Sequence, residues 1–210
     1  MRKVVVVAAT MLVALTVGAL ARNVARGAQG DPVTTLGDLS LELVGQVTNT
    51  PLGVTPATSN QYGYLSYLRG LRVFKAEPEN ETDALFTFYL QATTTRVLSD
   101  GPLRVLTRVG KLTIYHDPSA NGSFDKPDTF RDGAPILVAG LRQQVVIDTV
   151  TGAFTTHNLN QITSTTGFRS GSRELHLGRV GQKFETVLSG HQNMPPPPSG
   201  YFAGYTFGRT

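Results

Sequence analysis

The chain has 210 residues, of which 19 are basic, 15 are acidic and none is cysteine. The lack of cysteine excludes disulfide bonds, a thiol nucleophile, thiolate metal sites and iron–sulfur clusters. The basic residues are scattered among acidic ones and form no stripe with aromatic or helical support, so the sequence predicts no nucleic-acid partner.

The N-terminus has the pattern of a secretory signal. Arg2 and Lys3 precede the uncharged residues 4–20, and Ala19-Leu20-Ala21 places small residues where a signal peptidase cleaves. We therefore expect a signal peptide over residues 1–21, a flexible leader over 22–36, and a mature protein that is secreted or periplasmic. Cleavage lowers the formal net charge from +4 to +2, with 17 basic residues left against 15 acidic ones.

The alternative for this segment is a retained membrane anchor. The uncharged run approaches the roughly 20 residues that a membrane-spanning helix needs. In that case the membrane would be a partner only through the uncleaved signal segment.

Residues 37–210 are expected to form a single β domain, and its first half alternates with period two. An apolar segment over 39–47 precedes a loop rich in Pro, Thr and Asn over 48–60. An aromatic, strand-like segment follows over 62–74, and an acidic loop over 77–83. The firmest strand is expected over 85–95, where aromatic and β-branched residues suit a pleated, buried surface.

The second half continues the pattern with turn dipeptides between strands. Asp100-Gly101 is a turn pair between the previous strand and one over 103–115. Further strands are expected over 136–141, 144–150 and 153–159, the last two joined as a hairpin by Thr151-Gly152. Residues 173–177 and 183–188 are predicted to pair with each other. After a Pro-rich spacer at 195–198, residues 201–208 are expected to close the sheet.

The class that this pattern indicates is all-β. We expect a single antiparallel β-barrel of about eight strands, or a β-sandwich. The barrel is favoured because a meander of short strands fits the length and closure removes exposed edges.

One loop has the oxygen spacing of a metal site. Residues 117–128 resemble the EF-hand calcium loop, with oxygen-bearing side chains at positions 1, 3, 5, 9 and 12 and Gly122 at position 6. The resemblance implies a possible calcium ion held by six residues: Asp117, Ser119, Asn121, Ser123, Asp125 and Asp128. It covers twelve residues only, since Asp replaces Glu at position 12 and the flanking segment is strand-like. The alternative is an ordinary polar loop with an Asx turn.

Catalytic motifs are missing from the sequence. None of the four histidines has a close-spaced His or Glu partner of the zincin type; they are His116, His157, His176 and His191. Residues 110–118 are similar to a strand-and-turn segment of the dirigent and allene oxide cyclase barrels. That likeness brings no catalytic residue with it, but it implies a small barrel whose interior holds an apolar ligand or a cyclising intermediate.

Three functional classes follow. The first is an exported β domain with a binding or structural role, whose partner is a small apolar ligand or an envelope or extracellular protein. The second is a small-barrel enzyme or carrier, cyclase-like or lipocalin-like, with a mouth lined by histidines and by Tyr62, Tyr64 and Tyr67. The third is a small outer-membrane barrel, although four charged residues interrupt the lipid-facing band it needs: Arg96, Arg104, Arg108 and Asp148.

Overall fold

A computed structural model describes residues 34–36, 39–50, 54–193, 196 and 199–208. The chain divides into residues 1–32 and a compact unit of residues 33–210, and all described residues belong to the second. The predicted signal peptide, most of the predicted leader and most of the Pro-rich spacer lie outside the described residues. None of the helices in the described part is long and apolar enough to cross a membrane.

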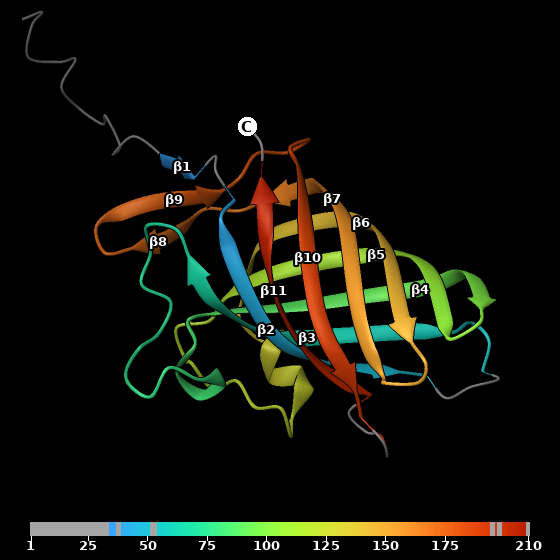
Figure 1. Ribbon diagram of the computed structural model, residues 1–210. Helices are drawn as coiled ribbons and strands as arrows, with labels where there is room; N and C mark the ends of the chain where they lie inside the picture. Colours follow the sequence, from blue (N-terminus) through green and yellow to red (C-terminus); the bar gives the residue numbers. More distant parts are fainter. Residues whose placement is uncertain (1–33, 37–38, 51–53, 194–195, 197–198, 209–210) are drawn as a thin grey trace, which may run out of the picture. The chain divides into compact units, whose positions relative to one another are not determined.

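Eight antiparallel strands close into a barrel, as the alternating pattern predicts (Figure 1). Around the barrel the order is β10-β11-β2-β3-β4-β5-β6-β7, so every neighbouring pair is antiparallel and no strand edge is left. The strands are β2 (Leu41–Asn49), β3 (Thr58–Leu68), β4 (Phe86–Asp100), β5 (Leu103–His116), β6 (Ala134–Asp148), β7 (Ala153–Thr165), β10 (Lys183–Gln192) and β11 (Gly200–Gly208).

The terminal strand and the predicted hairpin are confirmed. β11 pairs with β10 on one side and with β2 on the other, so the C-terminal segment closes the sheet. The 151–152 turn joins β6 to β7, and Gly152 there has a φ of +79°, a conformation that glycine adopts without steric cost.

Three sequence predictions about strands are wrong. Residues 173–177 do not pair with 183–188: they form β9 (Arg173–Leu177) in a separate small sheet with β1 (Thr34–Leu36) and β8 (Phe168–Ser170). A tight turn after β8 makes that strand the local partner of β9. The segments 136–141 and 144–150 belong to one continuous strand, β6, and β3 begins at Thr58 inside the predicted loop 48–60.

Side chains alternate between the inside and the outside of the barrel. Inside, Phe88 of β4 and Phe202 of β11 lie over Gly45 of β2, where a Cβ atom would come within 2.9 Å of both rings. Large rings from nearby strands therefore fill the space that Gly45 leaves.

One end of the barrel is closed by the core. Leu39, Leu175 and Leu177 are fully buried there and belong to the same hydrophobic cluster as the barrel interior. Phe168 of β8 packs edge-on against Phe86 of β4, with the ring centres 5.6 Å apart. The small sheet thus covers this end.

An aromatic cluster lies on the outside of the barrel. Tyr62 of β3 and Tyr89 of β4 stack with ring centres 6.0 Å apart, and Phe130 covers Tyr62 at 5.8 Å. Phe130 ends the short helix η2 (Pro127–Phe130), while η1 (Glu81–Asp83) lies in the β3–β4 connection. The loop between β5 and β6 is therefore held on the outer wall by buried rings.

Candidate functional site

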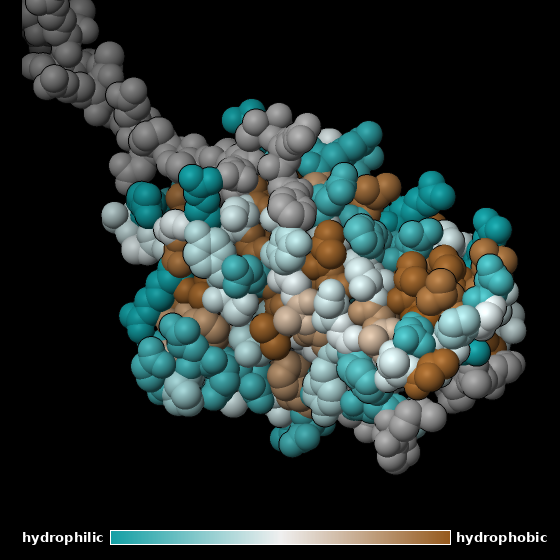
Figure 2. Space-filling view, in the orientation of Figure 1, coloured by the Kyte–Doolittle hydropathy of each residue, from teal (hydrophilic) through white to brown (hydrophobic). Residues whose placement is uncertain are grey.

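The other end of the barrel is open, and we call it the mouth. It is the end at which β2 stops at Asn49, β4 at Asp100, β6 at Asp148 and β10 at Gln192. β4 and β5 extend beyond the paired part of β3, since β3 begins opposite Thr93. The β4–β5 hairpin therefore forms a wall on one side of the mouth, and Figure 2 shows apolar side chains gathered over this region.

A bulge at Thr95 changes the direction of that wall. The β4–β5 register shifts between Thr94 and Arg96, and the Thr95 hydroxyl donates a hydrogen bond to the Thr107 carbonyl at 3.2 Å. Bulges are common at barrel rims and beside binding sites, where they bend the strand and redirect side chains. Here the bulge lies directly beside the Thr94–Arg108 pair, at the entrance to the interior.

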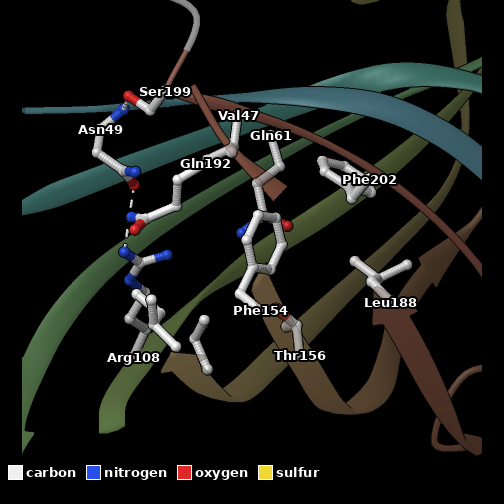
Figure 3. A pocket seen from close by; sticks show the side chains of 12 residues that line it. Val47, Asn49, Gln61, Arg108, Phe154, Thr156, Leu188, Gln192, Ser199 and Phe202 are labelled. Atoms are coloured by element: carbon white, nitrogen blue, oxygen red, sulfur yellow. Dashed lines mark hydrogen bonds between the residues drawn. The ribbon is translucent and has the colours of Figure 1, made fainter. Parts of the chain in front are cut away.

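Two spaces meet at the mouth. A cleft of about 370 Å³ lies between the β4–β5 hairpin and the start of β3, and a small interior cavity of about 30 Å³ lies below it. The cavity has room for about two water molecules. Four residues line both spaces: Asn49, Arg108, Ile147 and Gln192. Figure 3 shows Arg108 and Gln192 on one side of the cavity, with Phe202 and Leu188 opposite.

Arg108 is the buried charge of this site. Its position on β5 points into the barrel and only 6% of it is exposed. Its guanidinium donates three hydrogen bonds to neutral oxygens: Nε to Thr94 Oγ1 at 3.3 Å, Nη1 to Gln143 Oε1 at 3.3 Å, and Nη2 to Asn49 Oδ1 at 3.2 Å. All three distances are at or slightly beyond the long end of the normal range.

No carboxylate among the described residues neutralises this charge. Burial lowers the pKa of Arg108 to about 10, and no acidic group acts against that shift. At neutral pH the group remains charged. An unpaired charge in a protein interior costs several kcal/mol. A guanidinium has five N–H donors, and two of those of Arg108 have no acceptor among the described residues.

Amide side chains surround Arg108 on the inside. Gln143 is fully buried, accepts from Arg108 and from Gln61 Nε2 at 3.3 Å each, and donates to Asn158 Oδ1 at 3.0 Å. Gln143 therefore uses both ends of its amide, which keeps its oxygen turned toward the cation. The network contains one positive charge and only neutral partners.

Arg108 was not predicted as a site residue. In the sequence it is one of several scattered basic residues and an interruption of a lipid-facing band. The available signal is parity: Arg108 shares its side of the strand with Leu112 and Ile114, both buried in the barrel core. A charge on the apolar side of a strand was the clue.

The six predicted calcium ligands lie along the loop between β5 and β6, and several of them have hydrogen-bond or ion-pair partners there. Asp117 is buried and its Oδ1 accepts from the Ser119 N–H at 2.9 Å, which is an Asx turn. Asp128 is exposed and pairs with Arg131 at 2.7 Å, and Asn121 donates to Asp132 at 3.2 Å.

The remaining ligands of that set lie along the same loop. The Ser123 N–H donates to Thr129 Oγ1 at 2.8 Å, and Asp125 is exposed. Among the described residues, no group of three or more His, Asp or Glu side chains is placed to hold a metal ion. The calcium site stays a prediction of the sequence.

The predicted mouth of tyrosines and histidines is wrong. Tyr62 and Tyr64 lie on the outer side of β3, because the inward positions of that strand are Gln61, Gly63 and Leu65. Tyr64 packs edge-on against Phe74 with ring centres 5.9 Å apart.

The histidines do not converge either. The His116 ring lies 5.1 Å from Phe86 and 5.4 Å from Phe168 at the closed end, where burial lowers its pKa and Asp117 opposes that shift. His157 is exposed on the outside of β7, His176 lies in β9, and His191 is exposed.

The fold and the site together define a small closed β-barrel that is open at one end, with a buried guanidinium below the opening. In comparisons with protein-family models, curated proteins and solved structures, the chain matches none of them.

Proposed function

We propose that this protein is an exported binding barrel whose mouth holds one small amphipathic ligand. The observation that carries the proposal is the junction of the cleft and the interior cavity at Arg108 and its neighbours. A cleft of about 370 Å³ lies in the lower part of the range found for small-molecule sites. Apolar walls with a few placed polar groups are typical of such sites.

The chemistry of the lining supports recognition more than proton transfer. Apolar side chains such as Val97, Leu106 and Ile147 line the cleft beside hydroxyl, amide and guanidinium groups. Acid–base catalysis depends on a group that exchanges protons near the working pH. The lining that the structure describes instead offers fixed donors, acceptors and apolar area, which suits binding or carriage.

The distribution of charge on the barrel wall supports a domain that faces water. Glu42, Lys111, Arg142 and Glu185 are exposed on the outer side of their strands, while the inside is largely apolar. Outer-membrane barrels show the opposite arrangement, with an apolar outer band and a polar interior. Export itself rests on the signal-like residues 1–21 of the sequence.

Binding at the mouth can be tested with 1-decanol as an uncharged probe. We expect backbone NMR shifts on titration to concentrate on residues that line the cleft. Ala57→Trp, which fills the cleft from an exposed position, should abolish these shifts.

The matched control is Val180→Trp, on an exposed turn next to the other end of β10. Shifts that are scattered over the outer wall, or that survive Ala57→Trp, would contradict a mouth site.

Export has its own test. Expression of the full-length gene followed by cell fractionation should recover the protein in the periplasm or medium, with an N-terminus near residue 22. Recovery of the uncleaved chain in the cytoplasmic fraction would reject this half of the proposal.

A further inference from the structure

The charge of the ligand can be inferred from Arg108. The residue lies at the boundary between the cleft and the cavity, and only 6% of it is exposed. Its three long hydrogen bonds in the described part of the chain all go to neutral oxygens. The three oxygens that accept from Arg108 are neutral, so an uncharged side chain with N–H groups could satisfy them equally well. A guanidinium in this place retains two N–H donors and a full positive charge for something outside the protein chain.

The cleft above Arg108 adds to the positive potential. Arg104 also lines it, four residues before Arg108 on the same side of β5, and none of the residues that line the cleft in the described part of the chain is acidic. Asp100 and Asp148 are at the tips of the neighbouring turns. The Asp148 carboxylate accepts hydrogen bonds from the N–H groups of Val150 and Thr151 at 2.9 and 3.3 Å.

An apolar surface lies directly beside this charge. Val97 points toward the cleft from β4 and is 56% exposed, and Leu106 and Ile147 line the same space. Val97 lies opposite Leu106 in the β4–β5 pair, and more than half of its side chain remains open to the cleft. A ligand with an apolar body would cover it, while a small inorganic anion would not.

Resting on the proposed function, we infer that the ligand is a medium-chain carboxylic acid, with its carboxylate on Arg108 and its apolar body in the cleft against Val97, Leu106 and Ile147. A single buried cation is matched by a single negative charge, and guanidinium–carboxylate hydrogen bonds are among the strong ones in proteins. The residues that hold Arg108 in place are Gln143, Asn49 and Thr94.

The test compares probes with alkyl tails of nine or ten carbons and different heads: decanoate, decanol, decyl phosphate and decyltrimethylammonium. Isothermal titration should show decanoate binding about tenfold to hundredfold more tightly than decanol, since a hydrogen bond to a charged group contributes that much. Decyl phosphate should bind no more tightly than decanoate if Arg108 alone holds the head group, and the cationic probe should bind weakest of all.

Two arginine variants separate the site from general charge. Arg108→Gln should bind decanoate and decanol equally, whereas Arg142→Gln, on the exposed outer wall, should keep the full preference. Circular dichroism checks that Arg108→Gln is folded. If it is not, Arg108→Lys replaces it: this variant keeps the charge and should keep part of the preference for decanoate. A shift of the Arg108 Nε–H signal on adding decanoate gives a direct readout in the wild type.

The outcomes distinguish this inference from the proposed function. If decanoate and decanol bind equally at the mouth of the wild type, the inference of a carboxylate ligand is wrong, while the proposed binding function is still supported. A preference for decanoate that persists in Arg108→Gln also overturns it, because the charge would then act elsewhere. If no ten-carbon probe binds at the mouth, both the inference and the proposed function fail.

Discussion

Inside the barrel, Nη1 of Arg108 donates a hydrogen bond to Oε1 of Gln143 at 3.3 Å, with both side chains buried. The two residues face each other across neighbouring strands β5 and β6, in direct register. A buried cation thus depends for its orientation on an amide whose own position is fixed by Gln61 and Asn158. This dependence should be measurable as a coupling energy.

Gln143→Leu should lower the free energy of unfolding by about 1–3 kcal/mol, because it leaves buried donors and acceptors without partners. In the double variant with Arg108→Met, the loss should be smaller than the sum of the two single losses by about 0.5–3 kcal/mol. Urea unfolding of the four proteins gives the cycle. Gln144→Leu, on the exposed outer face of β6, should leave stability nearly unchanged and serves as the control; strictly additive losses would show that the pair is not coupled.

Two glycines in the barrel wall should respond in opposite ways to alanine. At Gly45 a Cβ atom would lie 2.5 Å from the Tyr62 carbonyl oxygen, a backbone atom, so Gly45→Ala should destabilise the barrel by about 1–3 kcal/mol. At Gly140 nothing lies within 4 Å of the added atom, so Gly140→Ala should be neutral or stabilising by about 0.4–1 kcal/mol. Thermal melts of the two variants give the comparison. Equal losses of stability would contradict the close packing described over Gly45.

Asp148 should make the β6–β7 turn sensitive to acid. A hydrogen bond with the Thr151 side chain, together with those from the Val150 and Thr151 N–H groups, lowers the pKa of Asp148 below its usual 3.8. A lowered carboxyl pKa stabilises the fold above pH 3.8, and this contribution is lost as the pH falls through the lower, folded-state value. Asp148→Ala should therefore melt at a lower temperature than the wild type at pH 7, and the difference should shrink as the pH falls below 3.8. A difference that does not change with pH would assign the effect to the turn backbone instead.

The 117–128 loop allows a direct test of the calcium prediction. In the structure Asp117 holds an Asx turn and Asp128 pairs with Arg131, so we expect the melting temperature to be the same in calcium and in chelator. A rise of several degrees with calcium, abolished by Asp117→Ala, would show instead that the loop rearranges around the ion.

The strand pattern and the turns could be predicted from the sequence because both depend on neighbouring residues. Alternation with period two marks β4 and β11, and glycine at a positive φ marks the β6–β7 turn. Pairing between distant segments could not be predicted this way. β9 pairs with β1, about 140 residues away, and therefore belongs to the small sheet and not to the barrel.

The site was decided by closure of the barrel. Asn49 and Arg108 are 59 positions apart in the chain, and Gln143 is a further 35 positions beyond Arg108. That Arg108 shares one side of its strand with Leu112 and Ile114 follows from the sequence alone, because side-chain direction in a strand is a local property. That this side is buried, and that it holds no acidic partner among the described residues, follows only from the fold, because burial and pairing depend on which strands become neighbours when the sheet closes.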